Sequence, residues 1–160
     1  MTIVFYSLIE MTERIELGGR VLVIFDGHCG LCNGSVRWFL RSDRLDRMRF
    51  VASQSPLVAE LLARNGIVAA DQGAEVAPSS ILVVRNADGP AERVLERSEA
   101  VLALLDELPR PWPGISGALR CVPQAVRDLA YRLIARWRYR IWGRLESCPL
   151  PTAEERARFL

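Results

Sequence analysis

The stretch that decides the fold is Val21-Leu22-Val23-Ile24-Phe25-Asp26-Gly27-His28-Cys29-Gly30-Leu31-Cys32-Asn33-Gly34. The continuous apolar run at its start is typical of a strand that is buried on both faces, and we expect that strand over residues 20–25. The amphipathic pattern after the stretch predicts a helix that ends near Ser42. Two cysteines with C-x-x-C spacing therefore lie between a buried strand and the start of a helix.

This position suits cysteines that switch between dithiol and disulfide. The free N–H groups and the dipole at a helix start favour negative charge, and a thiolate is such a charge. A C-x-x-C pair beside a β-α pattern is typical of a redox-active site. We expect Cys29, nearer the helix start and more exposed, to be the nucleophile. We expect Cys32 to be the shielded resolving thiol, and no bound cofactor is required.

Two polar residues beside the cysteines each have two interpretations. Asp26 ends the strand, either as a turn residue that binds nearby backbone N–H groups or as a buried carboxylate that takes the proton from Cys32. His28 either tunes the neighbouring Cys29, as an imidazolium or a proton carrier, or is an exposed turn residue. Both interpretations of each residue stay open at this point.

The main alternative for the cysteine pair is half of a structural zinc site. The other candidate ligands, Cys121, Cys148 and His28, lie far away and singly in the sequence. We therefore favour the redox interpretation over a non-catalytic metal-binding or interaction module that uses Cys29, Cys32 and Cys148, and we expect no metal. Cys121 is expected to be a small buried hydrophobe, whereas Cys148 is a candidate third thiol.

Composition limits the class of protein. A chain of 160 residues with a net charge of +2 suits one domain and indicates no general affinity for nucleic acid. No apolar run approaches the ~20 residues that a membrane span needs, and the N-terminus lacks the pattern of a signal peptide. Four cysteines are too few for a disulfide-stapled secreted scaffold, so we expect a cytoplasmic protein. Either Met1 or Met11 remains open as the true start.

The predicted elements follow the order of a thioredoxin-like α/β core. After the first strand and helix we expect a strand at 48–52, a helix at 56–65, strands at 80–85 and 93–96, and a helix capped by Ser98 that stops at Pro109. A right-handed crossover makes the first two strands parallel, and the last two form a hairpin. The β-α-β-α-β-β-α core thus spans residues 20–109, after an N-terminal extension at 1–19.

Residues 110–160 are expected to form a C-terminal helical extension packed on the core. Pro109–Gly114 is predicted to be a stiff connector, and a longer helix follows from Pro123 to about Trp142. Thr152 and Glu155 resemble a capping box for a last short helix. The long helix carries an apolar stripe that we expect to face the core, consisting of Val126, Leu129, Ala130, Leu133, Trp137 and Ile141.

Arginines flank that stripe on both sides, Arg127 and Arg138 on one and Arg132, Arg136 and Arg140 on the other. Such a helix can make weak peripheral contact with an anionic membrane or partner. We favour the simpler interpretation, in which the arginines form the solvated edge of a helix that faces the core.

The segment from Asp26 to Val36 closely resembles the DCC family, small predicted thiol–disulfide oxidoreductases named for an Asp-Cys-Cys motif. The likeness continues at Phe50-Val51-Ala52-Ser53, at Ile81-Leu82-Val83, and at Arg138-Tyr139-Arg140-Ile141-Trp142-Gly143-Arg144 with Cys148 after it, so it spans about residues 20–160. It implies a thioredoxin-like fold with Asp26, Cys29 and Cys32 as the signature. It also implies protein or small-molecule disulfides and dithiols as partners, with an unknown electron donor.

One further residue follows from the expected fold. Thioredoxin-like folds place a cis-proline loop just before the strand that faces the cysteines, and Pro78 precedes the strand at 80–84. We therefore predict that the Ala77–Pro78 bond is cis and that Pro78 belongs to a substrate loop.

Overall fold

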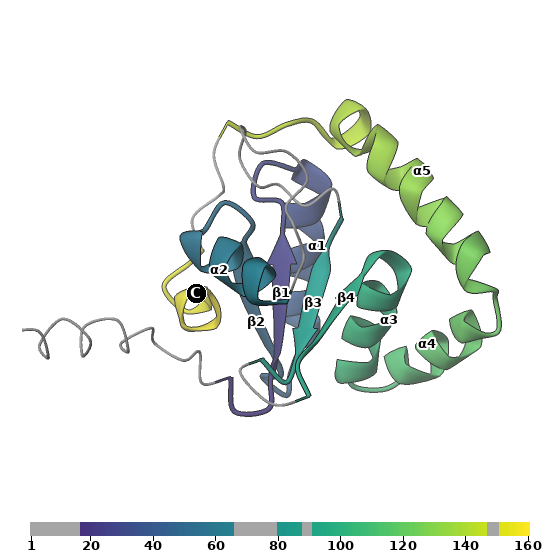
Figure 1. The fold of residues 1–160 in the computed structure, drawn as a ribbon, viewed down its shortest axis with the longest axis horizontal. Helices are drawn as coiled ribbons and strands as arrows, with labels where there is room; N and C mark the ends of the chain where they lie inside the picture. The colour runs from purple at the N-terminus through teal and green to yellow at the C-terminus, as the bar shows by residue number, and fades with distance from the viewer. Residues whose placement is uncertain (1–16, 66–79, 88–90, 147–150) are drawn as a thin grey trace, which may run out of the picture.

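The computed structural model describes residues 17–65, 80–87, 91–146 and 151–160 (Figure 1). Its strands are β1 (Val21–Phe25), β2 (Met48–Ala52), β3 (Leu82–Arg85) and β4 (Arg93–Glu96). Its helices are α1 (Gly30–Ser42), α2 (Pro56–Arg64), α3 (Arg97–Glu107), α4 (Trp112–Arg120) and α5 (Gln124–Trp142), and a short 3-10 helix, η1 (Glu155–Arg158), follows.

The four strands form one sheet in the order β2-β1-β3-β4. β1 and β2 are parallel, as the crossover through α1 requires, while β3 runs antiparallel to both β1 and β4. This mixed sheet with helices on both faces is a thioredoxin-like fold, so the predicted fold class is confirmed.

β1 lies in the middle of the sheet and is buried on both faces. All five of its residues are at most 4% exposed. Val21, Val23 and Phe25 belong to the core shared with α1 and α3, whereas Leu22 and Ile24 belong to the core shared with α2. Side chains alternate across a strand, so a helix on each face makes every position apolar. This explains the unbroken apolar run that precedes Asp26.

The predicted connector at Pro109–Gly114 is wrong, because α4 begins within it at Trp112. Pro111 and Pro113 flank that first residue. Proline is tolerated there because the first N–H groups of a helix have no partner within the helix, and its fixed φ suits the first turn. α4 then packs against α3, where the hydroxyl of Ser116 donates a hydrogen bond to the carbonyl of Leu102 at 3.2 Å.

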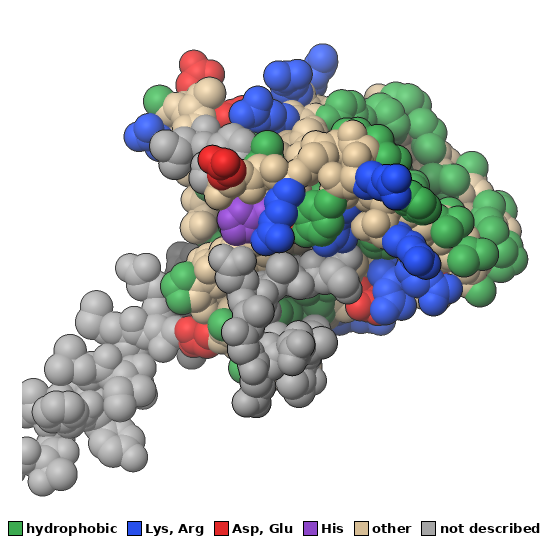
Figure 2. Space-filling model, turned by 90° about the horizontal axis from the view of Figure 1, so that it is seen from above, with side chains coloured by type: hydrophobic (Ala, Val, Ile, Leu, Met, Phe, Trp, Pro, Cys, Tyr) green, Lys and Arg blue, Asp and Glu red, His purple; other side chains and the backbone are tan. Residues whose placement is uncertain are grey.

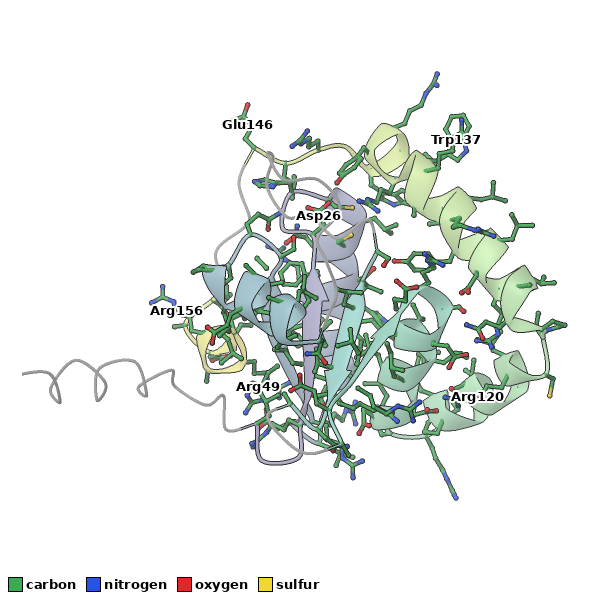
Figure 3. All side chains as sticks on the ribbon, in the orientation of Figure 1. Asp26, Arg49, Arg120, Trp137, Glu146 and Arg156 are labelled. Atoms are coloured by element: carbon green, nitrogen blue, oxygen red, sulfur yellow. The ribbon has the colours of Figure 1, made fainter. Side chains whose placement is uncertain are left out.

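The apolar stripe of α5 exists, but its predicted direction is wrong. Its five large members, Val126, Leu129, Leu133, Trp137 and Ile141, are between 45% and 63% exposed. Figure 2 shows hydrophobic side chains gathered over this helix, and Figure 3 shows Trp137 pointing away from the body. The arginines are therefore not the edge of a core-facing stripe, and contact with an anionic surface stays a prediction.

The inner face of α5 is polar and is held by hydrogen bonds and ion pairs. Ser98 is not the cap of α3, since that helix begins at Arg97 and the hydroxyl of Ser98 donates to Asp128 on α5. Arg127 forms an ion pair with Glu99 at 2.8 Å. Periodicity reveals an apolar stripe but not what it faces, and here polar contacts decide the orientation.

Two further expectations about the C-terminal half have mixed outcomes. Cys121 is exposed at the end of α4, so the expected buried position is wrong. The capping box is confirmed, because Thr152 N donates to Glu155 Oε2 at 2.9 Å and Glu155 N donates to Thr152 Oγ1 at 3.3 Å. The element that it caps is a single 3-10 turn. In the described part of the chain, no helix is both long and apolar enough to cross a membrane.

After α5, residues 143–146 cross over the carboxyl end of β1 (Figure 1), and the segment 151–160 lies beside β2. There Phe159 pairs with Phe50, and Leu160 N donates to the Phe50 carbonyl at 2.9 Å. The C-terminal end of the chain is thus fastened to the edge of the sheet. The crossing segment lies over the residues that join β1 to α1.

Candidate active site

Cys29 is the N-cap residue of α1. Its backbone is extended, with φ −95° and ψ 121°, and its Sγ accepts the N–H of Cys32 at 3.3 Å. The sulfur therefore stands in for the side-chain oxygen that usually caps a helix, at the positive end of the helix dipole. The predicted position of Cys29 at the start of a helix is therefore present, and its role as the nucleophile stays a prediction.

The expected exposure of Cys29 is wrong, because its side chain is 0% exposed. Residues 143–145, which we call the C-terminal strap, lie across it. Leu145 N donates to the His28 carbonyl at 2.8 Å, Gly30 N donates to the Gly143 carbonyl at 3.3 Å, and Arg144 forms an antiparallel bridge with Cys29. The strap comes from more than 110 positions further along the chain, so no local pattern could indicate it.

Gly30 is what permits this close approach. A Cβ atom at position 30 would lie 2.3 Å from the carbonyl oxygen of Trp142, a distance that side chains do not occupy. Gly34, one turn further along α1, has open space around its Cα. Glycine at position 30 therefore lets the backbone before the strap rest directly on the first turn of α1.

Cys32 is the more accessible of the two thiols, which reverses the predicted order. It is half-buried and lines a cavity of about 490 Å³. Burial raises the pKa of the Cys32 thiol, and its contact with Cys29 raises it further, while the nearby Arg138 opposes both. The role of Cys32 as the resolving thiol stays a prediction, and the expectation that it is the shielded thiol is wrong.

The cavity beside Cys32 is largely apolar. Its polar lining includes Asp26, Ser80, Tyr131 and Arg138. Its apolar wall comes from α1, α3, α5 and the residue before β3, with Leu31, Trp38, Phe39, Ile81, Val101, Leu105, Ile134 and Trp142. A largely apolar cavity of this size with a few polar groups is typical of a small-molecule site.

Asp26 is buried at the end of β1, between α1 and α5 (Figure 3). Its Oδ1 accepts the backbone N–H of His28 at 3.0 Å, so the turn role is present. Its Oδ2 accepts the hydroxyl of Tyr139 and lies 3.5 Å from the guanidinium of Arg138. Burial and then the hydrogen bond to Asp26 raise the pKa of Tyr139, so the phenol stays a donor. Asp26 also contributes to the raised pKa of Cys32.

His28 is half-buried and faces Gln54 rather than open solvent. Its Nδ1 lies 3.2 Å from Gln54 Nε2, which also approaches Asp26 Oδ1 at 3.4 Å. The ring lines a shallow hollow with Arg144, Leu145 and Glu146. Its role in tuning Cys29 stays a prediction.

Sequence reasoning missed three residues around the cysteines, namely Arg138, Tyr139 and Gln54. Arg138 and Tyr139 come from α5, 112 and 113 positions after Asp26. A signal for them existed, because the segment 138–144 carried part of the family resemblance. What the sequence lacked was any indication that α5 turns these two polar side chains towards the end of β1.

Two predicted site residues, Pro78 and Cys148, lie outside the described residues. The cis bond at Pro78 and the role of Cys148 as a third thiol therefore stay predictions. Within the residues that the structure describes, no group of three or more His, Cys, Asp or Glu side chains is placed to hold a metal ion.

Comparisons with known proteins identify a family. The family model of DCC1-like thiol-disulfide oxidoreductases matches residues 23–144. A chloroplastic DCC family protein of Arabidopsis thaliana is 36% identical over 88% of this chain and 76% of its own length. The uncharacterized protein YuxK of Bacillus subtilis is 31% identical over 91% of this chain and 96% of its own. No solved structure gives a significant match.

Proposed function

The chain belongs to the DCC1-like thiol-disulfide oxidoreductase family, and from that premise we propose that it exchanges disulfides through a mixed disulfide on Cys29. The observation that carries this proposal is the hydrogen bond from Cys32 N to Cys29 Sγ at the start of α1. A sulfur held there is stabilised as the attacking thiolate and also as the leaving group when the mixed disulfide resolves.

In the first step the Cys29 thiolate attacks one sulfur of a substrate disulfide. The substrate S–S bond breaks, a bond between Cys29 and the substrate forms, and the departing thiolate takes up a proton. The C-terminal strap must move for this step because it covers Cys29. Trp142, just before the strap, also lines the cavity of Cys32, so a molecule bound there lies next to the segment that has to move.

In the second step Cys32 attacks Cys29, releases the second substrate thiol and leaves a Cys29–Cys32 disulfide. Burial raises the pKa of Cys32, so its thiol must lose a proton as it attacks. Asp26 is the buried carboxylate in the same cavity, and we assign it the role of proton acceptor. Arg138 lowers the pKa of Cys32, so it stabilises the thiolate that forms when the proton leaves Cys32.

The proposal includes protein or small-molecule disulfides as substrates and an external dithiol as electron donor. It also includes a cytoplasmic setting, where a reactive cysteine pair in a chain with only four cysteines serves exchange rather than structural stapling.

The test is reduction of a protein disulfide with dithiothreitol as donor, together with a redox titration of the Cys29–Cys32 couple. Wild type should accelerate reduction, and Cys29→Ser should abolish the acceleration. A potential of about −270 mV identifies a reductant and one of about −120 mV an oxidant. Full activity in Cys29→Ser, or stoichiometric zinc in freshly purified protein, would contradict the proposal.

A further inference from the structure

A second cavity, of about 400 Å³, adjoins the cavity of Cys32 and is lined by arginines. Its wall includes Arg97, Arg132, Arg136 and Arg138 together with Tyr131 and Tyr139. Among the described residues that line it, none is acidic. Figure 2 shows arginine side chains gathered beside the apolar surface of α5. Four guanidinium groups around one small cavity create a strongly positive potential.

Two of these arginines are available to bind an anion. Among the described residues, Arg132 and Arg136 form no ion pair, whereas Arg97 lies 3.5 Å from the exposed Glu96 and Arg138 is paired with Asp26. Arginine binds carboxylates through two parallel N–H groups, a geometry that holds the ligand in a fixed orientation. The cavity is therefore built for a negatively charged group.

The two cavities are adjacent. Ser80, Tyr131, Ala135 and Arg138 line both of them. Tyr131 is held in place, because its hydroxyl accepts the backbone N–H of Ile81 at 2.9 Å. A small molecule with its anionic group among the arginines thus lies next to the cavity that Cys32 lines.

We propose that this arginine-lined cavity binds the carboxylate of an anionic small-molecule disulfide and directs its S–S bond to the cysteine pair. This inference rests on the proposed function and names its substrate class. The reaction moves two electrons: the substrate S–S bond is reduced to two thiols while Cys29 and Cys32 become a disulfide. A dithiol such as dithiothreitol then reduces the protein again.

The first experiment compares two small disulfides of opposite charge, glutathione disulfide and cystamine. For each disulfide, the rate constant of its reduction by the reduced protein is divided by the rate constant of its reduction by dithiothreitol. This ratio removes the difference in intrinsic reactivity between the two disulfides. For wild type, this ratio should be about tenfold or more higher for glutathione disulfide than for cystamine. A difference of that size is expected when only one of the two ligands forms hydrogen bonds to charged groups. The preference should shrink at high salt, since exposed charges are screened.

The double variant Arg132→Gln/Arg136→Gln should remove most of that preference. The matched control, Arg44→Gln/Arg93→Gln, changes the net charge equally at two exposed arginines outside the cavity and should keep it. Equal loss in both double variants would show that only net charge matters and would overturn the inference.

A second experiment measures binding without exchange, using S-methylglutathione, a thioether that has no disulfide to reduce. Trp38 and Trp142 line the adjoining cavity, so their fluorescence reports occupancy. Binding to wild type that weakens about tenfold in Arg132→Gln/Arg136→Gln supports the site. If the protein exchanges disulfides but neither binds S-methylglutathione nor prefers glutathione disulfide, the anion site is overturned and the proposed function stands. If it binds S-methylglutathione but exchanges no disulfide, the proposed function is overturned and the anion site stands.

Discussion

The sulfur of Cys29 caps α1 and lies fully buried under the C-terminal strap, whereas the sulfur of Cys32, one turn further on, faces a cavity. Cys29 has the helix-start position that we propose for the nucleophile, but the strap covers it. Cys32 lines the cavity, and burial raises its pKa. The proposed nucleophile and the more accessible thiol are thus two different residues within a single turn of helix.

This difference gives the strap a specific role. Its backbone occupies the hydrogen-bonding groups of His28 and Gly30, which an extended substrate segment would otherwise meet. We expect that displacing the strap exposes the Cys29 sulfur and leaves Cys32 in place for the second attack that we propose. We expect the strap to limit access to Cys29, and we expect Arg138 and Asp26 to act on Cys32.

The largest effect is expected from Gly30→Ala. Its Cβ would lie 2.3 Å from the Trp142 carbonyl oxygen, so the backbone around the strap must move away from Cys29. The rate of Cys29 alkylation by iodoacetamide, followed by mass spectrometry, should rise by about tenfold or more. A tenfold rise corresponds to a decrease of ~1.4 kcal/mol in the free energy of local opening at the strap.

Gly34→Ala is the matched control for this experiment. It adds the same methyl group to the same helix at a position with nothing within 4 Å. Its Cys29 alkylation should equal that of wild type. Equal rates in the two glycine variants would show that the strap does not limit access.

A smaller effect is expected from Arg138→Gln, which removes the positive charge that lowers the pKa of Cys32. If the pKa of Cys32 rises by about one unit, its thiolate fraction at neutral pH falls about tenfold. The thiolate of a thiol with a higher pKa is also more nucleophilic, and this offsets part of the loss in rate. Resolution of the mixed disulfide should therefore slow about threefold to fourfold. The pH dependence of Cys32 alkylation and the rate of resolution measure both quantities.

Arg140→Gln serves as the control for that variant, because it removes one charge from an exposed position on the same helix, over the ring of Trp137. It should leave the alkylation profile of Cys32 unchanged. A shift as large as that of Arg138→Gln would assign the effect to net charge rather than to this side chain.

The smallest effect is expected from Asp26→Asn. The carboxylate is the least of the named causes that raise the pKa of Cys32, so its loss should lower that pKa by less than about one unit. Taken alone, the lower pKa speeds resolution, whereas loss of the proton acceptor slows it. A lower pKa combined with slower resolution identifies Asp26 as the acceptor. The control is Asp106→Asn, which removes a carboxylate on α3 that pairs with Arg120 and should change neither quantity. If neither quantity changes in Asp26→Asn either, Asp26 is only a turn residue.

The sequence was sufficient for the core of the fold because its signals were local. The unbroken run Val21–Phe25 requires cover on both faces, and α2 and α1 supply it. The cysteine spacing at a helix start predicted the N-cap position of Cys29 and its contact with the N–H of Cys32, which depend only on the first turn of α1.

The rest depended on contacts across more than 100 residues. The strap that buries Cys29 and the pair formed by Arg138 and Asp26 both come from α5 and its end. The stripe of α5 was visible, but its direction was not, since polar contacts such as that of Ser98 with Asp128 fix the opposite face to the core. Exposure of a site residue is a property of the whole chain, and a local motif cannot supply it.

The measurement that tests the central claim most directly is disulfide trapping with the two single-cysteine variants of the pair. Cys32→Ser keeps the activated sulfur and lacks the resolving thiol, so it should accumulate mixed disulfides on Cys29 with a model protein disulfide. Cys29→Ser should trap little at Cys32 at neutral pH, because burial raises the pKa of that thiol. Non-reducing electrophoresis and mass spectrometry count the adducts at each position. Equal trapping by both variants, or more by Cys29→Ser, would contradict the assignment of attack to Cys29.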